Sequence, residues 1–510
     1  MAFKLEDFQE KHKEAIQSCP VKVTLIGHTE QPYDTAIASA RTCYSSKGIL
    51  YPADMTKNEA AVNLRDRIAK STLRAGHLTT RQHSHYIFAI EGLSRYTIWQ
   101  FLHAHPYYNS EQVSQRYVPI KKGENWYSLP QSLNNEKVID WVNECHQSYL
   151  ELIEILKPTV SEEFFQIHKL KARAPEKYQK DIEKRAMEVA RYLMPLATTA
   201  YLYHTVSSLT LYRYIKMAEY YDNAEIKALV FALAQCVINV DPLMEREFPE
   251  PAQPDWQDPD PSEANSFNQE FDAELGNFYS KLIKYDSDYT RILDYGQGTA
   301  GPNSFHYLNT EKNQLLGDTL YPVTMQPQGR MLHHLHYTFL KKLSHTADSQ
   351  EQRHRTLPGS RPLLFHQVSL ENDYIIPELL KIDSKALDYY NSFMDKNFEL
   401  IRNLYKDGYK LQDLSYLLPN AFPVRFLESG DLLNFYHKWK ARLCYNAQEE
   451  IFYSAKDEVL QIRKVQPEIG LQVGPPCYLR NSLKPRCPEG DHFCGIKVWQ
   501  IPLDQYKRTI

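Results

Sequence analysis

The stretch His85–Ser94, HYIFAIEGLS, decides the fold prediction, because a close copy of it, HYTFLKKLS, occurs at His336–Ser344. In the first copy, large apolar residues fall at every second position (Tyr86, Phe88 and Ile90), which predicts a β-strand. A second copy of such a segment in the other half of the chain suggests an internal repeat. We therefore expect one folding unit to be present twice.

The match between the two halves extends well beyond this strand. Three further pairs of segments match in the same order: Leu93–His105 with Leu343–Arg355, Ala190–Tyr201 with Leu414–Phe422, and Tyr221–Leu229 with Cys444–Phe452. Each pair alone is a weak signal, but four pairs in one order are not expected by chance. The sequence therefore predicts a tandem protein.

A segment near the middle of the chain separates the two copies. Glu250–Glu270 reads EPAQPDWQDPDPSEANSFNQE and is rich in Pro and Asp, which disfavour both helices and strand ladders. We expect a first copy at 1–248, a linker at 249–272, a second copy at 273–470 and a cysteine-containing tail at 471–510.

Each copy is expected to mix a few strands with long helices. Val21–Gly27 alternates like a strand. Thr56 and Glu59 have the spacing of a capping box, which predicts a helix that ends at Gly76. Thr97–His105 is predicted to form a short helix or turn.

Helices are expected to dominate the remainder of the first copy, to about Asn239. In the second copy, apolar residues from Leu432 to Ile451 follow a period of 3.6, which predicts one last long helix.

Composition and charge exclude several classes of protein. The 510 residues include 59 Lys and Arg against 63 Asp and Glu, so the near-neutral chain gives no support for nucleic-acid binding. The N-terminus has no apolar signal segment, and the longest apolar run, near Ala228–Ile238, is too short to span a bilayer. We expect a cytoplasmic protein without a membrane partner.

Two short segments carry groups suited to binding an anion. Ser110–Tyr117, SEQVSQRY, offers an Arg for phosphate and hydroxyl and amide groups for the edges of a heterocycle. Arg353–Arg355, an Arg-His-Arg triplet, suits a phosphate or pyrophosphate beside a redox ring. By themselves, these segments also fit a polar loop with a structural Arg and an exposed basic turn.

The order of these motifs resembles the flavin-dependent thymidylate synthase family. The resemblance rests on ARTCYS at 40–45, on the run from Gly76 to Arg95, on SQRYV at 114–118 and on the triplet at 353–355. It implies an α+β fold in two tandem copies, each a small antiparallel sheet flanked by long helices.

The family signature is divided between the two copies. The first copy keeps Glu111, Ser114, Arg116 and Tyr117 but has HAH at 103–105 in place of the triplet. The second copy keeps the triplet and has lost the Glu/Ser/Arg segment. Two later arginines divide likewise, because Arg191 is present only in the first copy and Arg442 only in the second.

The resemblance implies a role for each matched residue. In the substrate site, Arg116 and Arg191 would hold the phosphate of dUMP with Ser114, in a segment that includes Gln115 and Tyr117. Three residues are expected to be catalytic: Arg442, which would bind and polarise the uracil, Gln350, which would orient it, and Glu111, which would bridge substrate and flavin. The flavin contacts are expected to be His334, Arg353, His354, Arg355 and His437.

The resemblance also implies the reaction and the assembly. The cofactor would be FAD, with NADPH and methylenetetrahydrofolate as co-substrates, and dUMP would be methylated to dTMP. Because each copy keeps the part of the signature that the other lacks, we expect composite sites and a homodimer that forms a pseudo-tetramer.

Two other functions remain open on the sequence. The family's flavin-contacting Asn and Arg positions before the last helix carry Asp431, Leu433 and His437, and Val113 lies beside an inserted residue. These departures are compatible with flavin-dependent modification of another pyrimidine nucleotide. They are also compatible with a non-catalytic scaffold that binds flavin or nucleotide.

The tail is a separate question. Cys477, Cys487 and Cys494, with His492, offer ligands for zinc or a cluster, but their spacing lacks a CxxC knuckle. Reduced thiols in a short loop are the interpretation favoured by the sequence, so no metal site is predicted.

Overall fold

The computed structural model describes residues 3–103, 107–297, 304–313, 326–480 and 483–510. The chain forms two compact units. Unit 1 comprises residues 1–114, 120–139 and 196–257, and unit 2 comprises residues 115–119, 140–195 and 258–510. Each unit is described by itself.

Unit 1 is built on a four-stranded antiparallel sheet with the order β1-β2-β4-β3. Its strands are β1 (Lys22–His28), β2 (His85–Ser94), β3 (Asn109–Gln112) and β4 (Thr199–Ser207). The strand predicted from alternation is confirmed, because Tyr86, Phe88 and Ile90 of β2 are all completely buried.

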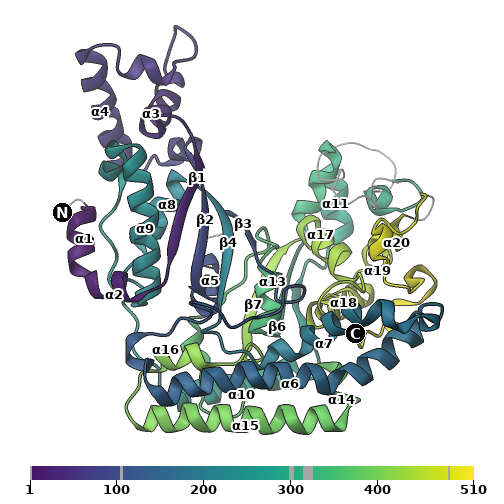
Figure 1. Ribbon diagram of the computed structural model, residues 1–510. Coiled ribbons are helices and arrows are strands. Elements are labelled where there is room, and N and C mark those ends of the chain that lie inside the picture. Colours follow the sequence, from purple (N-terminus) through teal and green to yellow (C-terminus); the bar gives the residue numbers. More distant parts are fainter. Residues whose placement is uncertain (1–2, 104–106, 298–303, 314–325, 481–482) are drawn as a thin grey trace. The chain divides into compact units, whose positions relative to one another are not determined.

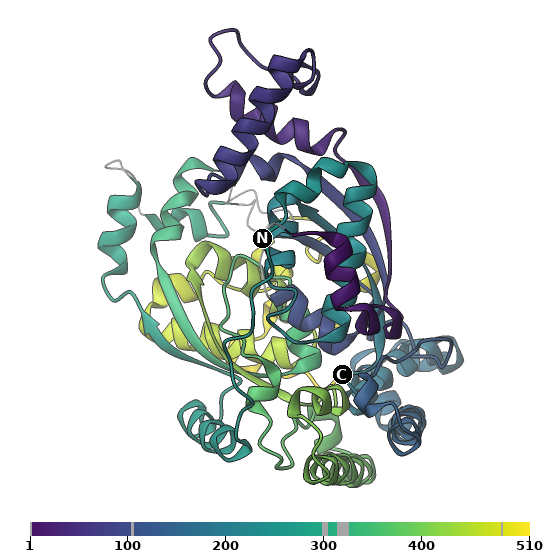
Figure 2. The same ribbon diagram turned by 90° about the vertical axis from the view of Figure 1, so that its left-hand side faces the viewer.

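Helices bury the apolar face of this sheet. The helices of unit 1 are α1 (Leu5–Lys11), α2 (Lys13–Ser18), α3 (Pro32–Thr42), α4 (Glu59–Arg74), α5 (Arg95–His103), α8 (Ser208–Lys216) and α9 (Ala224–Val240). The buried side chains of β2, β4 and α9 belong to one hydrophobic core. Helices α3 and α4 extend beyond one end of the sheet (Figures 1 and 2).

The start of α4 differs from the prediction. The capping residue is Asn58, whose side chain accepts a hydrogen bond from the amide of Ala61, and Glu59 is the first helical residue. Asparagine at this position satisfies a free backbone amide as well as threonine does, so the helix begins two residues later than predicted. Its end before Gly76, which has a φ of 74°, is confirmed.

Unit 2 contains a three-stranded antiparallel sheet with the order β5-β6-β7. Its strands are β5 (Ser280–Tyr285), β6 (His336–Ser344) and β7 (Pro423–Asp431). This order repeats β1-β2-β4, and β6 is the segment that the sequence matched to β2. At the place of β3, this sheet has only an isolated antiparallel bridge, from Gly359 to Glu428 of β7.

Two long helices from different halves of the chain pack together in unit 2. Helix α6 (Glu136–Ile167) lies against α15 (Ser384–Lys406), as Figure 1 shows. The indole Nε1 of Trp141 donates to Oδ1 of Asn397 at 2.7 Å, and its ring stacks on Phe393 at 5.4 Å between centroids.

The other helices of unit 2 are shorter. They are α7 (Gln179–Ala190), α10 (Pro261–Leu275), α11 (Tyr289–Gln297), α13 (His345–Glu351), α14 (Glu378–Lys381), α16 (Leu411–Leu414), α17 (Leu432–Arg442), α18 (Glu449–Val465), α19 (Pro467–Gly470) and α20 (Pro476–Leu479).

The repeat is visible in hydrogen bonding as well as in strand order. In unit 1 the amide of Ser94 donates to Glu225 at 2.9 Å, and in unit 2 the amide of Ser344 donates to Glu450 at 2.6 Å. Each Ser ends the central strand and each Glu lies in the first turn of a late helix. Glu225 and Glu450 are therefore equivalent residues in the structure. The sequence alignment had matched Glu225 to the position two residues before Glu450.

Equivalent segments of the two halves also meet each other within unit 2. Pro195 and Pro419, which the sequence aligned, form an isolated antiparallel bridge. Next to it, the amide of Asn420 donates to the carbonyl of Met194 at 2.8 Å. Contact between equivalent residues is the pattern of a two-fold interface, here formed inside one chain.

Two expectations about helices are wrong. The segment expected to be a linker contains α10. The side chain of Asp260 caps this helix by accepting a hydrogen bond from the amide of Ser262 at 2.8 Å, and Pro261 occupies the first turn, where proline is tolerated. The predicted last long helix is broken into α17 and α18 by the turn at 443–448, where Gln448 caps the second helix. Apolar periodicity runs through such a break because both helices face the same core.

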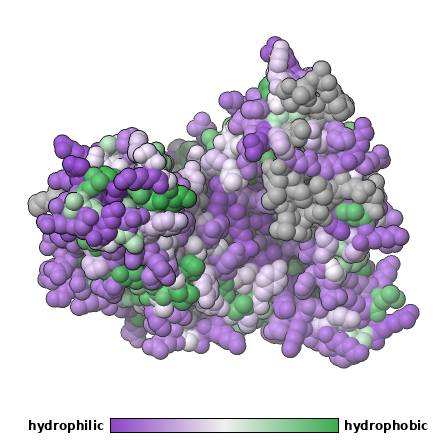
Figure 3. Space-filling model, turned by 90° about the horizontal axis from the view of Figure 1, so that it is seen from above, coloured by the Kyte–Doolittle hydropathy of each residue, from purple (hydrophilic) through white to green (hydrophobic). Residues whose placement is uncertain are grey.

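In the described ranges, no helix is long and apolar enough to cross a membrane. On the face drawn in Figure 3, hydrophilic residues predominate and hydrophobic ones form small patches.

Candidate functional site

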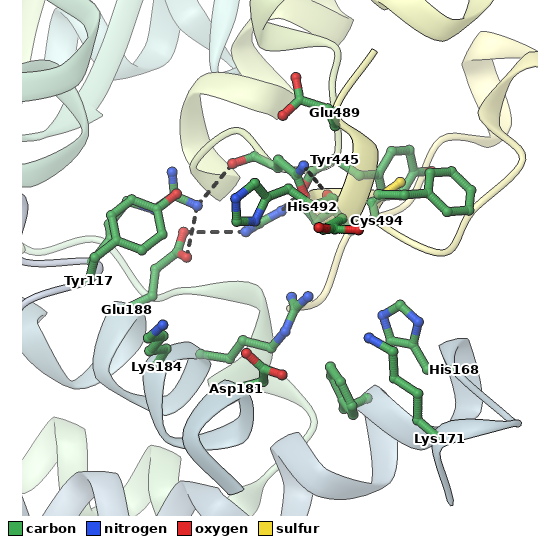
Figure 4. A pocket seen from close by; sticks show the side chains of 17 residues that line it. Tyr117, His168, Lys171, Asp181, Lys184, Glu188, Tyr445, Glu489, His492 and Cys494 are labelled. Atoms are coloured by element: carbon green, nitrogen blue, oxygen red, sulfur yellow. Dashed lines mark hydrogen bonds and ion pairs between the residues drawn. The ribbon is translucent and has the colours of Figure 1, made fainter. Parts of the chain in front are cut away.

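A cavity of about 540 Å³ lies in unit 2, and its lining carries five Lys and Arg side chains against the four acidic side chains of Asp181, Glu188, Glu489 and Asp491; we call it the basic cavity. One side is formed by Arg116 and Tyr117 and by the ends of α6 and α7, and the other by the 443–448 turn and the tail (Figure 4). Its cationic residues are Arg116, Lys171, Lys184, Arg185 and Arg508. The volume is in the range of small-molecule sites.

Glu188 organises the arginines at this cavity. Its carboxylate accepts from Nη2 of Arg116 at 3.0 Å and from Nη2 of Arg508 at 3.3 Å (Figure 4). Burial alone would raise the pKa of Glu188, but the guanidinium groups of Arg116, Arg508 and Arg191 outweigh it and lower the pKa to about 2. Glu188 is therefore an anion at neutral pH that holds two arginines in place.

Arg191 lies directly behind this pair. It follows α7 in a single turn of 3₁₀ helix, and its side chain is almost completely buried, with 2% exposure. Its Nε donates to the carbonyl of Glu188 at 3.1 Å, whereas Nη2 has no hydrogen-bond partner within the described ranges. A buried guanidinium nitrogen without a partner is costly and indicates a place for an anion.

The second half of the chain contributes Arg442, the last residue of α17. Its Nε donates to Nε2 of His354 at 2.8 Å, and its Nη2 donates to the carbonyl of Gln350 at 3.0 Å. Burial and the charge of Arg442 lower the pKa of His354 well below its usual value. His354 is thus a neutral acceptor that aims the guanidinium of Arg442.

The two groups of arginines approach each other. Nη2 of Arg116 donates to the carbonyl of Asn446 at 3.0 Å, only four residues after Arg442. Arg442 is half-buried, with 15% of its side chain exposed; desolvation lowers its pKa, and the nearby charges of Arg353 and Arg116 lower it further. The structure therefore brings Arg116, Arg191, Arg442 and Arg353 into one unit, from both halves of the chain.

A buried cluster of charges supports Arg442 from behind. Lys341 and Lys438 contact the carboxylates of Glu351, Glu428 and Glu458, and all five side chains are at most 1% exposed. Three negative charges face two positive ones, and Arg442, 3.9 Å from Glu351, supplies the third positive charge. We call these five residues the buried charge cluster.

The cluster joins most of the elements around the site. Its residues come from β6, β7, α13, α17 and α18, and Trp439 donates to Glu458 at 2.7 Å. Electrostatic attraction to the two lysines lowers the pKa of Glu351 well below its usual value despite burial. A fully ionised cluster of this kind fixes the end of α17, where Arg442 is placed.

Four other predicted site residues lie in unit 2. Gln115 is buried and accepts from Asn420 at 3.2 Å, and Tyr117 lies under the guanidinium of Arg116 at 5.4 Å. His437 stands with its ring 5.8 Å from that of His354. Arg355 follows His354 in the triplet and is half-buried.

Three further predicted residues lie on other segments of the chain. Glu111, on β3, and Ser114 belong to unit 1. His334 is exposed at the end of a 3₁₀ helix before β6. Of the first copy's HAH segment, Ala104 and His105 lie outside the described residues.

Most residues at the cavity were not predicted, among them Glu188, Arg185, Lys171 and Arg508. Glu188 precedes Arg191 by three positions on one helical face, a spacing that could have drawn attention to it. Arg185, Lys171 and Arg508 gave no such signal, because they come from helix surfaces and from the last residues of the chain.

Comparison with known proteins identifies the family. A family model described as "Thymidylate synthase complementing protein" matches residues 24–243 and 293–468. The chain belongs to this family of enzymes, and the two matched segments fit the tandem arrangement.

Curated relatives match about one third of the chain each. A flavin-dependent thymidylate synthase of Geobacter sulfurreducens is 28% identical over 169 residues, 32% of this chain and 70% of that protein. The enzyme of the same name from Pyrococcus abyssi is 25% identical over 188 residues, 34% of this chain and 77% of its own.

A solved structure with weaker similarity is that of a UMP/dUMP methylase, PolB, from Streptomyces cacaoi bound with 5-Br dUMP. It has a TM-score of 0.31 and 11% identity over 45% of this chain and 94% of its own.

Proposed function

We propose that this protein is a flavin-dependent enzyme that methylates dUMP to dTMP, with methylenetetrahydrofolate as the carbon donor and NADPH as the reductant. The observation that carries the proposal is the convergence of Arg116 and Arg191 from one half of the chain with Arg442 from the other. Family membership and the names of the curated relatives support it.

Phosphate binding is assigned to the arginines around Glu188. A nucleotide phosphate is a strong multivalent acceptor, and the planar guanidinium fork matches it. The partnerless Nη2 of Arg191 would gain a charge-assisted hydrogen bond. Arg116 would exchange part of its contact with Glu188 for the phosphate, so the carboxylate keeps this arginine in place until substrate arrives.

Activation of the uracil is assigned to Arg442. Its guanidinium is already aimed by His354 and by the Gln350 carbonyl. In a largely buried position, a fixed positive charge stabilises the negative charge that develops on a ring oxygen as C5 forms its new bond. Gln350 would orient the ring, and Glu111 would bridge substrate and cofactor.

The triplet residues fit the cofactor. Arg353 and Arg355 place cationic groups on either side of a neutral His354, a set that suits the phosphates and the uncharged ring system of FAD. They would hold the flavin with His334 and His437. When bound, reduced flavin supplies the hydride that completes the methyl group.

The assembly that we propose is a homodimer in which the four copies form a pseudo-tetramer. The pairing of Pro195 with Pro419 supports this, because it is a two-fold contact of the kind that subunits make. The cytoplasmic location expected from the sequence stays a prediction.

The test is a dUMP titration of the purified full-length protein, followed by the flavin absorbance spectrum and by a dTMP assay with NADPH and methylenetetrahydrofolate. Arg191→Gln should weaken dUMP binding about 10- to 100-fold, the equivalent of one charge-assisted hydrogen bond. Arg173→Gln, at an exposed position, is the matched control and should bind normally.

Three results would contradict the proposal. Wild-type affinity in Arg191→Gln would remove the phosphate assignment. Turnover of a different pyrimidine nucleotide, with none of dUMP, would change the substrate. A colourless protein that binds neither added flavin nor dUMP would indicate a non-catalytic scaffold.

A further inference from the structure

Four of the eight cysteines surround one small apolar cavity in unit 2. Cys444 comes from the turn between α17 and α18, and the others come from the tail: Cys477, Cys487 and Cys494. Their neighbours in the lining include Pro475, Pro476, Pro488 and Val498. All four thiols are free. The sequence had grouped only the three tail cysteines, because Cys444 is 33 residues before the nearest of them.

The backbone around these cysteines is shaped for tight turns. Cys487 begins the turn Cys-Pro-Glu-Gly, in which Gly490 has a φ of 54°. Cys494 is followed by Gly495 at a φ of 85°, and a Cβ there would stand 2.5 Å from Cε1 of His168. A glycine directly after a cysteine is therefore required by both the dihedral angle and the available space.

One of the sulfurs also contacts the backbone of its own turn. The thiol of Cys494 donates to the carbonyl of Ile496, two residues further along, at 3.7 Å. This contact helps to hold the Cys494 side chain at the edge of the cavity.

We propose that Cys444, Cys477, Cys487 and Cys494 ligate a metal centre through four thiolates. Iron–sulfur clusters and Zn²⁺ are the two kinds of centre that take this ligand set. The family signature uses none of these four residues, and only Cys494 also lines the basic cavity, so the proposal does not depend on the reaction.

The arrangement of the thiols favours an iron–sulfur cluster over a single ion. A single Zn²⁺ needs its sulfurs at about 2.3 Å from one point. In the part of the chain that the structure describes, no three His, Cys, Asp or Glu side chains are arranged to hold one ion. The thiols surround a hollow instead.

The cavity between the four cysteines must enlarge when the metal centre forms. The cavity volume is only about 10 Å³, so the cavity walls have to move apart to hold a metal centre. Three of the four ligands come from a tail that is built of short helical turns and irregular segments. Coupling of metal binding to the final folding of such a segment is usual, because a finished site rarely exists without metal.

The centre would fix one wall of the substrate cavity. Tyr445, Asn446, Glu489, Phe493 and Cys494 line both the cysteine cavity and the basic cavity. The side chain of Asn446 donates to the carbonyl of His492 at 2.7 Å, and its own carbonyl holds Arg116. Loss of the metal should therefore loosen the tail and weaken anion binding at Arg116.

The experiment is metal analysis of the full-length protein purified without oxygen, before and after incubation with Fe²⁺ and sulfide or with Zn²⁺. We expect about four iron and four sulfide per chain for a cluster, or about one zinc for a single ion. Elemental analysis is used because flavin absorption would mask a cluster's visible spectrum. Either metal supports the site and identifies the centre.

Variants make the assignment specific. Cys477→Ser with Cys487→Ser should lose the metal and make the tail sensitive to trypsin near Arg486. Cys236→Ser, which removes a thiol in unit 1, is the matched control, and this variant should keep the metal. Metal retained at full occupancy in the double variant would overturn the proposal. So would a wild-type protein that takes up neither metal, even if it binds dUMP normally.

Discussion

The buried charge cluster makes the sharpest prediction about what holds the site together. Lys438 is completely buried and contacts carboxylates of Glu351, Glu428 and Glu458. Lys438→Met keeps most of the volume of the side chain but removes the charge. Three buried carboxylates then face Lys341 alone, with Arg442 at the edge.

The magnitude follows from the missing charge. Removing one partner of a fully buried ion pair costs about 3–5 kcal/mol, because the remaining charge stays desolvated without compensation. The pKa of Glu458, which the two lysines keep low, should rise in the variant. Since that cost is a large part of the stability of a typical domain, the transition of unit 2 should shift clearly.

The assay is equilibrium urea unfolding followed by tryptophan fluorescence, to which Trp439 at the cluster contributes. The free energy of unfolding follows from the midpoint and slope of the transition. Lys396→Met, on an exposed position of α15, is the matched control and should change stability by less than about 0.5 kcal/mol.

A double variant separates charge balance from packing. Lys438→Met with Glu428→Gln removes one charge of each sign and should recover part of the loss, so the two effects are not additive. The reasoning is refuted if Lys438→Met costs no more than Lys396→Met. It is also refuted if the double variant loses the sum of the single losses.

Three further predictions test other parts of the structure. Burial raises the pKa of Glu449 to about 8, so the folded state keeps a proton that the unfolded chain releases above about pH 4.5, and this group makes stability fall from there to about pH 8. Glu449→Gln should make the fall shallower in thermal scans across that range, although Asp457, whose pKa burial raises to about 6, still contributes. An equal slope in both proteins would contradict the prediction. Asn58→Ala should cost about 1 kcal/mol in urea unfolding, because it removes the cap of α4, and no change would show that the hydrogen bond to Ala61 does not matter. Trp141→Phe keeps the stack on Phe393 but removes the indole N–H that donates to the buried Oδ1 of Asn397. The free energy of unfolding should fall by about 1–3 kcal/mol. An unchanged midpoint of urea unfolding would argue against this contact of α6 with α15.

The fold was largely predictable because its main signals are local. Alternation identified β2, and the repeat placed β6 at the matching position. β4 and β7 were missed, although Ala190–Tyr201 and Leu414–Phe422 had been matched as repeat segments. In β4 the exposed face carries the aromatic Tyr201 and Tyr203, and in β7 buried positions carry Arg425 and Glu428, so residue type did not follow burial.

The break between α17 and α18 shows the limit of periodicity. The apolar residues from Leu432 to Ile451 keep one spacing because both helices face the same core. Only the N-cap Gln448, whose side chain accepts a hydrogen bond from the amide of Ile451, marks the start of α18. A side-chain cap of this kind depends on a rotamer and cannot be recognised from spacing alone.

The sequence by itself determined the tandem repeat, the strands that alternate cleanly, the family resemblance and the division of the signature between the two halves. These follow from the order and type of residues along the chain. The tertiary structure alone decided that Glu188 joins Arg116 to Arg508, that the buried charge cluster stands behind Arg442, and that Cys444 completes the tail cysteines. Those contacts join residues tens to hundreds of positions apart, and their chemistry depends on burial, which exists only once the chain has folded.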